Sequence, residues 1–242
     1  MPVGLLFLSL SSHIQSLAKV AGNGSPRSRT GIMLIEWVWG SKPPANLVLQ
    51  IQNWNFSAWA GPGYGYAVSY DDPGLLPTWA DVIEQSLTRS QQRIARLGRV
   101  SVTYVDCVRA LLPRFSDYIA RIPPTAFLDD TTTKNVLINE GRLSGIVDVD
   151  YVCFGDPLFT VALTRMALVS MGADLEYTDA WCAALALDAH QRAALTLYTC
   201  VFCVDFLSEV GHIGNQNTAT ATDDQRITQL RTVFERLMRA MG

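Results

Sequence analysis

Five aspartates lie within a largely apolar stretch, residues 127–157. They are Asp129, Asp130, Asp148, Asp150 and Asp156. Only 17% of the residues in the chain are charged, and a carboxylate beside a buried strand costs free energy unless another group pairs with it. The clustering therefore indicates that the protein binds something that pairs with these side chains.

Two strand-like segments, residues 135–138 and 143–150, flank a short turn and predict an antiparallel hairpin. With the turn centred near Gly141, Asn135 would face Asp148 across the two strands. Directly opposed Cα atoms in such a pair lie about 4.5–5.5 Å apart. The start of one strand and the end of the other would then bring an amide oxygen and a carboxylate together.

Asp130 precedes Asn135 on a loop that can fold back to the same end of the hairpin. Two carboxylates and an amide oxygen suit a hard cation with oxygen ligands, above all Mg²⁺. A Mg²⁺ ion with few protein ligands usually holds phosphates as well. The pattern therefore predicts Mg²⁺-assisted chemistry on a phosphate. The alternative is that Asp130, Asn135 and Asp148 are ordinary turn and strand-end residues.

The composition is that of a folded protein, with 49% hydrophobic residues and a mean hydropathy of +0.16. A net charge of −3 and a pI near 5.6 argue against a nucleic-acid partner. Without an apolar run of bilayer length, no membrane partner is expected. Five cysteines without framework spacing indicate reduced thiols and a cytoplasmic location.

Two segments allow a second interpretation. Cys200 and Cys203 form a C-x-x-C pair, which could be a redox or metal site, but their apolar surroundings favour a buried helix. Residues 1–14 have a short apolar core, but no Lys or Arg precedes it, as it would in a signal peptide. A buried helix or strand is therefore expected there.

Hydrophobic periodicity, caps and breakers predict that the C-terminal two-thirds of the chain is mostly helical, interrupted by the hairpin. Thr78 is expected to cap one helix, Pro113 to bend another and Asp156 to begin a third. A buried strand is expected over residues 32–40, and a long loop rich in Gly, Pro and Tyr over residues 55–78. The expected helices cover residues 46–54, 78–98, 106–122, 156–172, 176–187, 189–210 and 224–241.

The order of the chemical residues resembles a known family. Asp130 is followed by T-T-T-K and then Asn135, five residues further on. Asp148 follows an apolar Gly-Ile-Val, and Gly-Asp-Pro stands at 155–157. This order resembles the pattern of the aminoglycoside phosphotransferase and choline-kinase-like family. The resemblance covers about residues 30–242. It implies an α+β, protein-kinase-like fold with a mainly helical C-lobe and a catalytic β-hairpin.

The resemblance also implies roles for the acidic residues. Asp130 would orient the substrate hydroxyl or accept its proton. Asn135 and Asp148 would hold Mg²⁺ on the phosphates of ATP or GTP. Asp150 would help to order the metal loop, or lie solvated on the outer face of its strand. Asp156 would mainly cap its helix.

Further residues would contact the nucleotide and the acceptor. The backbones of Glu36 and Val38 would bind the adenine edge, and Lys134 would place a positive charge near phosphate or be solvated. In the resembled family, C-terminal helices line the acceptor site, where acids suit cationic substrates. Asp205 and Glu209, one helical turn apart, would be such acids, or would lie on an exposed helix face.

The sequence departs from the family pattern in two further places. Leu128 stands where the family usually has a His that braces the catalytic loop. The segment ahead of the expected hinge is too short for a full N-lobe with a Gly-rich loop and a nucleotide lysine. Residues 1–40 are therefore expected to be a reduced N-lobe with the hinge, with a break at 41–44, and residues 41–242 the helical C-lobe. A gene fragment, a misassigned start and a shortened protein would each give this pattern.

These observations predict ATP-dependent, Mg²⁺-dependent phosphoryl transfer to a hydroxyl of a small molecule. An alternative is a catalytically inactive, truncated kinase-like protein that binds a ligand or a partner. A third is a metal-dependent hydrolase, since clustered carboxylates also serve there.

Overall fold

The computed structural model describes residues 32–34, 60–67, 72–132, 135–139, 142–147, 151–213, 216–217 and 221–242. Its helices are α4 (Trp79–Leu97), α5 (Thr103–Arg109), the 3₁₀ helix η2 (Leu112–Phe115), α6 (Ser116–Ile119), α7 (Leu158–Ser170), α8 (Glu176–Ala184), α9 (Ala189–Glu209) and α10 (Ala221–Met241). Its strands are β1 (Ile32–Leu34), β2 (Gly65–Ala67), β3 (Thr125–Leu128), β4 (Val136–Asn139), β5 (Arg142–Ile146), β6 (Val152–Gly155), β7 (His212–Ile213) and β8 (Gln216–Asn217). The expectation of an α+β fold dominated by helices is confirmed.

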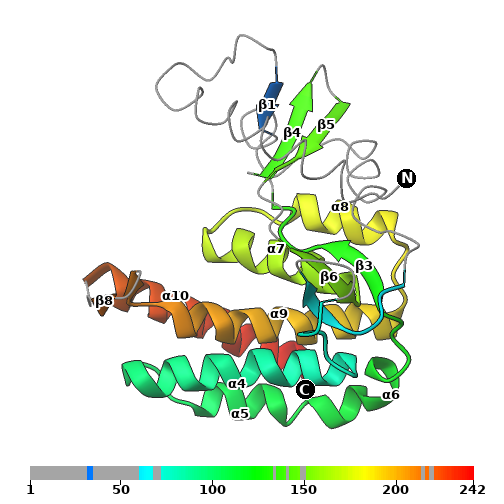
Figure 1. The fold of residues 1–242 in the computed structure, drawn as a ribbon. Helices are drawn as coiled ribbons and strands as arrows, with labels where there is room; N and C mark the ends of the chain where they lie inside the picture. The colour runs from blue at the N-terminus through cyan, green and yellow to red at the C-terminus, as the bar shows by residue number, and fades with distance from the viewer. Residues whose placement is uncertain are drawn as a thin grey trace.

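Helix α9 is the central element of the helical part (Figure 1). It packs against α7 on one side and against α4 and α10 on the other (Figure 1). A helix with apolar residues on all faces can be covered on all sides, and α9 is of this kind. Cys200 and Cys203 are fully buried in it as free thiols, so the expected buried helix is confirmed.

Local signals set the helix ends as the sequence predicts. The Thr78 side chain accepts a hydrogen bond from the Asp81 backbone N–H, and Asp81 bonds back to Thr78, which forms a capping box at the start of α4. Gly98 ends the same helix with φ +68°. Pro113 lies in η2, where the chain turns between α5 and α6. The expected bend is therefore confirmed.

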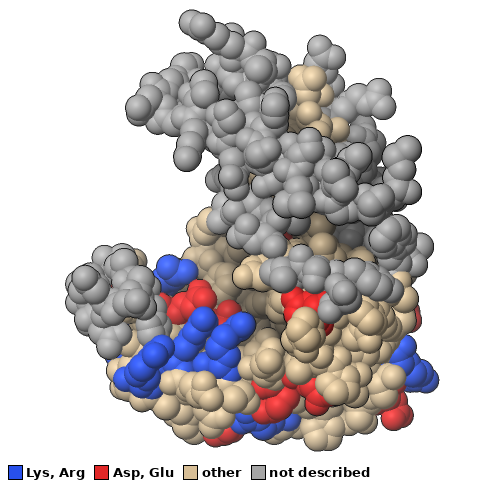
Figure 2. All heavy atoms as spheres, viewed as in Figure 1, with Lys and Arg blue, Asp and Glu red and all other residues tan. Residues whose placement is uncertain are grey.

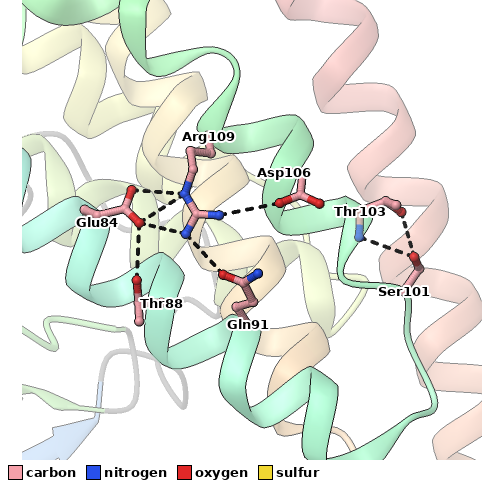
Figure 3. Close-up of polar contacts among 7 residues, drawn as sticks. All are labelled: Glu84, Thr88, Gln91, Ser101, Thr103, Asp106 and Arg109. Atoms are coloured by element: carbon pink, nitrogen blue, oxygen red, sulfur yellow. Dashed lines mark hydrogen bonds and ion pairs between the residues drawn. The ribbon is translucent and has the colours of Figure 1, made fainter.

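Hydrogen bonds of Arg109 connect α5 to α4 (Figure 3). Arg109 donates through Nε and Nη2 to the Glu84 carboxylate at distances of 2.7 to 3.2 Å. Its Nη2 also donates to Gln91 Oε1 at 3.3 Å. The hydrogen bonds with Glu84 raise the pKa of Arg109. This paired geometry holds the two helices in one orientation.

The Gly155–Asp156–Pro157 segment joins β6 to α7. Gly155 has φ +154°, and a Cβ there would overlap the Trp79 ring of α4. The Asp156 carboxylate is buried, and its Oδ1 accepts from the Leu158 backbone N–H at 3.0 Å. Asp156 therefore binds the first turn of α7 as predicted, although the helix begins at Leu158, one residue later than expected, with Pro157 at the N-cap position.

Asp156 also gathers two tyrosines. Its Oδ2 accepts hydrogen bonds from Tyr118 at 2.8 Å and from Tyr198 at 2.9 Å. Tyr198 in turn accepts from Trp79 Nε1 at 2.9 Å. Burial raises the pKa of Asp156, and its three hydrogen bonds oppose that increase. The carboxylate therefore links α6, α7 and α9 directly, and α4 through Tyr198.

Two sequence predictions were wrong in detail. Residues 65–67 form β2, which pairs with β6, inside the segment 55–78 that was expected to be a loop. In the hairpin, the backbone N–H of Val147 donates to the carbonyl of Asn135 at 2.8 Å, so Asn135 lies across from Val147 instead of Asp148. The physical reason is a tighter closure of the hairpin, in which Asn139 pairs with Arg142. The bulge at Ser144, which has no partner between Leu143 and Gly145, then moves the residue opposite Asn135 by only one position, from Ile146 to Val147.

Several predictions fall outside the described residues. They concern residues 1–14, the helix over 46–54 and the hinge at 41–44. β1 covers the start of the strand expected over 32–40 and pairs with β4, with Ile32 opposite Asn139. The division into residues 1–40 and 41–242 stays a prediction.

The contact between Gly155 and Trp79 gives a stability prediction. Gly155→Ala should lower the free energy of unfolding by roughly 2–4 kcal/mol, because the methyl group overlaps a buried ring and φ is positive. Gly98→Ala is the control: φ is also positive, but its Cβ would meet open space, so a loss of about 1 kcal/mol is expected. Urea unfolding of both variants measures the difference. Equal losses would contradict the proposed overlap.

Candidate functional site

The candidate catalytic residue Asp130 lies just beyond the end of β3. The sheet order is β2-β6-β3, and Cys153 of β6 lies opposite both Tyr66 and Phe127. The chain leaves the sheet after Leu128, so the two aspartates that follow stand at the sheet's edge. The loop from this point leads directly into β4.

Hydrogen bonds within the loop give it a defined shape. Asp130 Oδ1 accepts from the Thr132 backbone N–H at 3.1 Å. The Asn135 side-chain nitrogen donates to the carbonyl of Asp130 at 3.2 Å, and its backbone N–H donates to the carbonyl of Thr132 at 2.9 Å. The two predicted functional residues Asp130 and Asn135 are therefore in contact, as the sequence predicted for one end of the hairpin.

Two helices, α7 and α8, form hydrogen bonds with the loop. The Thr160 hydroxyl of α7 donates to the carbonyl of Asp129 at 2.6 Å and lies 3.2 Å from the Thr131 hydroxyl. The Tyr177 hydroxyl of α8 donates to the carbonyl of Thr131 at 3.2 Å. These bonds brace the loop in a chain that has Leu128 in place of the family's His. Sequence reasoning missed Thr160 and Tyr177, since both are distant in the chain and lie in ordinary helices.

Asn135 is a buried polar residue at the start of β4, with 4% of its surface exposed. A buried amide is costly unless its polar atoms have partners. Its nitrogen is bonded to Asp130, while its side-chain oxygen makes no hydrogen bond to the described part of the chain. No described residue occupies this oxygen, so it is available to a ligand.

Asp129 is the unexpected member of the site. Its Oδ1 is buried and finds no hydrogen-bond partner among the described residues. The pKa of Asp129 is raised to about 6, mainly by burial and also by the charge of Asp130, while a hydrogen bond from Tyr66 opposes the increase. Strand alternation contains a signal for this contact, because Asp129 follows Phe127 by two residues, and Phe127 and Tyr66 share a partner on β6.

Asp205 and Glu209 lie on α9 facing α4. Asp205 Oδ1 accepts from Ser90 at 3.1 Å and pairs with Arg93 at 3.4 Å and Arg89 at 3.5 Å. Glu209 pairs with Arg93 at 3.2 Å. The charges of Arg89 and Asp205 act on the pKa of Asp129, so this cluster lies near the catalytic loop. Neither acid stands alone on a helix face, and the sequence prediction did not include their arginine partners.

The remaining predicted site residues fall outside the described part of the chain. They are Glu36, Val38, Lys134, Asp148 and Asp150. Within the described residues, no group of three or more His, Cys, Asp and Glu side chains could hold a metal ion. This is consistent with a predicted metal site in which Asn135 is the described ligand and the two carboxylate positions are undescribed.

The comparisons with known proteins match this geometry. A family model described as the phosphotransferase enzyme family matches residues 66–195, more than half of the 242 residues. The chain therefore belongs to this phosphotransferase family, and the resemblance drawn from the sequence is confirmed. No curated protein matches the sequence.

Solved structures share the fold at low sequence identity. Aminoglycoside phosphotransferase APH(4)-Ia aligns with a TM-score of 0.59 and 14% identity, over 86% of this chain and 69% of that chain. A thermostable mutant of it in complex with AMP-PNP and hygromycin B aligns with a TM-score of 0.53 and 15% identity, over 81% of this chain and 66% of that chain. Choline kinase LicA from Streptococcus pneumoniae aligns with a TM-score of 0.54 and 11% identity, over 93% of this chain and 79% of that chain.

These likenesses establish the protein-kinase-like fold with its helical C-lobe. The chain spans 66% of the length of the complex with AMP-PNP and hygromycin B, just under two thirds. In the part of the chain that the structure describes, no helix has the length and apolar character needed to cross a membrane.

Asp129 gives a prediction about pH and stability. Because its pKa is raised in the folded state, the folded protein keeps a proton between about pH 4 and pH 6 that the unfolded chain has lost. Stability should therefore fall as pH rises through this window, by up to about 3 kcal/mol. Asp129→Asn removes the carboxyl and should remove the part of that fall that belongs to Asp129, whereas Asp156, whose pKa is also raised, keeps its own part.

Urea unfolding in Mg²⁺-free buffer from pH 4 to pH 8 measures this dependence. Asp117→Asn, a change at an exposed residue of α6, should keep the pH dependence of the parent protein. If Asp129→Asn and the parent have parallel stability curves, the buried environment described for Asp129 is wrong.

Proposed function

We propose that this protein transfers a phosphoryl group from Mg²⁺-bound ATP or GTP to a hydroxyl group of a small molecule. The observation that carries the proposal is the braced loop in which Asp130 and Asn135 touch. Family membership supports phosphotransfer in general. The nucleotide, the metal and the acceptor are the parts that the proposal adds.

Asp130 would act on the acceptor hydroxyl. Its Oδ1 is engaged by Thr132, whereas its Oδ2 makes no hydrogen bond to the described residues. A carboxylate with one oxygen fixed and the other available can orient a hydroxyl and take its proton as the oxygen attacks the phosphorus. The bonds from Thr160 and Tyr177 to the adjacent backbone keep this carboxylate in position.

Asn135 fits a Mg²⁺ ligand. Its side-chain oxygen, which makes no hydrogen bond to the described residues, is the kind of ligand atom that Mg²⁺ prefers. Asp148 would be the second ligand, since it directly follows Val147, which is bonded to Asn135, and Asp150 would order the same loop. Bound Mg²⁺ would neutralise negative charge on the nucleotide phosphates.

The nucleotide and acceptor would lie on opposite sides of this loop. The backbones of Glu36 and Val38 would bind the base, and Lys134 would face the phosphates. A structural neighbour bound to AMP-PNP and hygromycin B supports a site for a nucleotide and a hydroxyl-bearing small molecule together. Asp205 and Glu209 would belong to the acceptor side, because the charge of Asp205 acts on the pKa of Asp129 beside Asp130.

Nucleotide binding and transfer test separate parts of the proposal. Calorimetry of ATP and GTP should show Mg²⁺-dependent binding, which Asn135→Ala and Asp148→Ala should each weaken at least tenfold. Asp130→Asn should keep nucleotide binding but lower phosphoryl transfer about 10²–10⁴-fold, because it removes the proton acceptor. Transfer is measured with ³²P-labelled nucleotide over a panel of hydroxyl compounds.

Matched controls lie outside the loop. Asn139→Ala changes the asparagine at the far end of β4, and Asp117→Asn changes an exposed aspartate. Both should retain binding and transfer. A folded protein that binds no nucleotide would refute the proposal. Mg²⁺-dependent binding without transfer to any acceptor would favour the inactive, ligand-binding alternative.

A further inference from the structure

A mixed-charge cluster joins α4 to α9 near the catalytic loop. Basic and acidic side chains lie side by side on this face (Figure 2). Arg89 and Arg93 are one turn apart on α4, and Asp205 and Glu209 are one turn apart on α9. Residues at this spacing share one face of a helix. Two arginines therefore face two acids across the interface.

The arginines are the more exposed partners of Asp205. The side chain of Asp205 is 13% exposed, against 46% for Arg89 and 31% for Arg93. One oxygen of Asp205 already accepts from Ser90 and pairs with both guanidinium groups. A ligand that approaches the part of the cluster at Asp205 from solvent would therefore meet positive guanidinium groups before it met that carboxylate. Glu209, 52% exposed, lies one turn further along α9.

The contacts of Arg89 leave most of its donors available. Its single contact, to Asp205, is 3.5 Å long, which is weak for a charged hydrogen bond. A guanidinium has five N–H donors in a planar fork that matches a carboxylate or a phosphate. Arg89 makes no other hydrogen bond or ion pair within the described residues. Its remaining donors can therefore bind an anion.

The position of Arg89 relates this group to the reaction. Its charge lowers the pKa of Asp129, while Asp205 raises it. Both charges act on Tyr66 as well. The charges of Arg89 and Asp205 are among the largest influences on both pKa values, and Arg93 and Glu209 lie one turn further along α4 and α9. An acceptor whose hydroxyl reaches Asp130 could place a second group at Arg89.

We infer that the acceptor carries an anionic group, a carboxylate or a phosphate, which binds Arg89 and, behind it, Arg93. The inference rests on the proposed function and specifies its acceptor. Asp205 and Glu209 hold the two arginines in place and do not themselves bind a cationic acceptor. A cationic acceptor would be repelled by the exposed guanidinium groups.

Four compounds on one three-carbon skeleton test the charge preference. They are glycerol, D-glycerate, glycerol 3-phosphate and 3-amino-1,2-propanediol. Calorimetry is done on the full chain with Mg²⁺ and saturating AMP-PNP, so that the phosphate compound cannot occupy the nucleotide site. Glycerate or glycerol 3-phosphate should bind at least tenfold more tightly than the neutral and cationic compounds. Comparing these two shows whether carboxylate or phosphate is preferred.

Three variants test the residues. Arg89→Gln should weaken binding of the preferred anion at least tenfold, and Arg93→Gln less. Asp205→Asn should strengthen it, because both guanidinium groups lose their competing carboxylate. Arg96→Gln, at an exposed arginine further along α4, should change nothing. Thermal unfolding of each variant checks that it is folded.

The sign of the Asp205→Asn effect separates the two interpretations of this cluster. Weaker anion binding or preferential loss of the amine compound in this variant would overturn the inference. Tighter binding of the neutral or cationic compound by the parent protein, or binding of none of the four, would also overturn it. So would weaker AMP-PNP binding in Arg89→Gln with unchanged anion selectivity, since Arg89 would then serve the nucleotide.

The nucleotide titration keeps this result apart from the proposed function. Repeating the anion titrations without AMP-PNP, using glycerate as the probe, measures the arginine site alone. Selective glycerate binding in a chain that binds no nucleotide would support the anion site and refute phosphoryl transfer. Nucleotide binding and transfer to an uncharged acceptor would do the reverse.

Discussion

The buried carboxylate of Asp156 is the interaction on which the helical part depends. It accepts hydrogen bonds from the Leu158 backbone and from Tyr118 and Tyr198, and Tyr198 also accepts from Trp79. Leaving such a group without its partners typically costs about 3–5 kcal/mol. The requirement for donors at this point therefore restricts how α4, α6, α7 and α9 can be arranged, and it explains why an aspartate can lie in an otherwise apolar core.

The hydrogen bonds of Asp156 also help to position the proposed reactive residues. Asp156 fixes the start of α7, and Thr160, one turn later, bonds to residues on either side of Asp130: to the backbone carbonyl of Asp129 and to the side-chain hydroxyl of Thr131. A catalytic side chain must be held close to its productive position by its surroundings. Here that support comes from helices packed on the core, which is why the loop keeps its internal hydrogen bonds although Leu128 provides no bracing polar group.

The acceptor specificity that we propose depends on a different part of the molecule. The loop and the Gly-Asp-Pro turn can serve phosphoryl transfer to many different acceptors, because one fold can host many substrates. The surfaces of α4 and α9 near the loop differ in kind: they are built from long charged side chains that can change without disturbing the core. Arg89 and Asp205 are of this type. An exposed Asp205 would attract a cationic ligand, whereas an Asp205 covered by Arg89 favours an anionic one.

The sequence by itself determined the features that depend on neighbouring residues: the capped helix α4, the bend at Pro113, the cap at Asp156 and the spacing of Asp130 and Asn135. Local hydrogen bonds and backbone preferences act over a few residues and can be read from a short window. Only the tertiary structure decided the bulge at Ser144, the strand that brings Tyr66 to Asp129, the bracing of the loop by Thr160 and Tyr177, and the pairing of Asp205 with Arg89. Each of these joins residues whose separation or register depends on how the rest of the chain packs, and no local pattern fixes that.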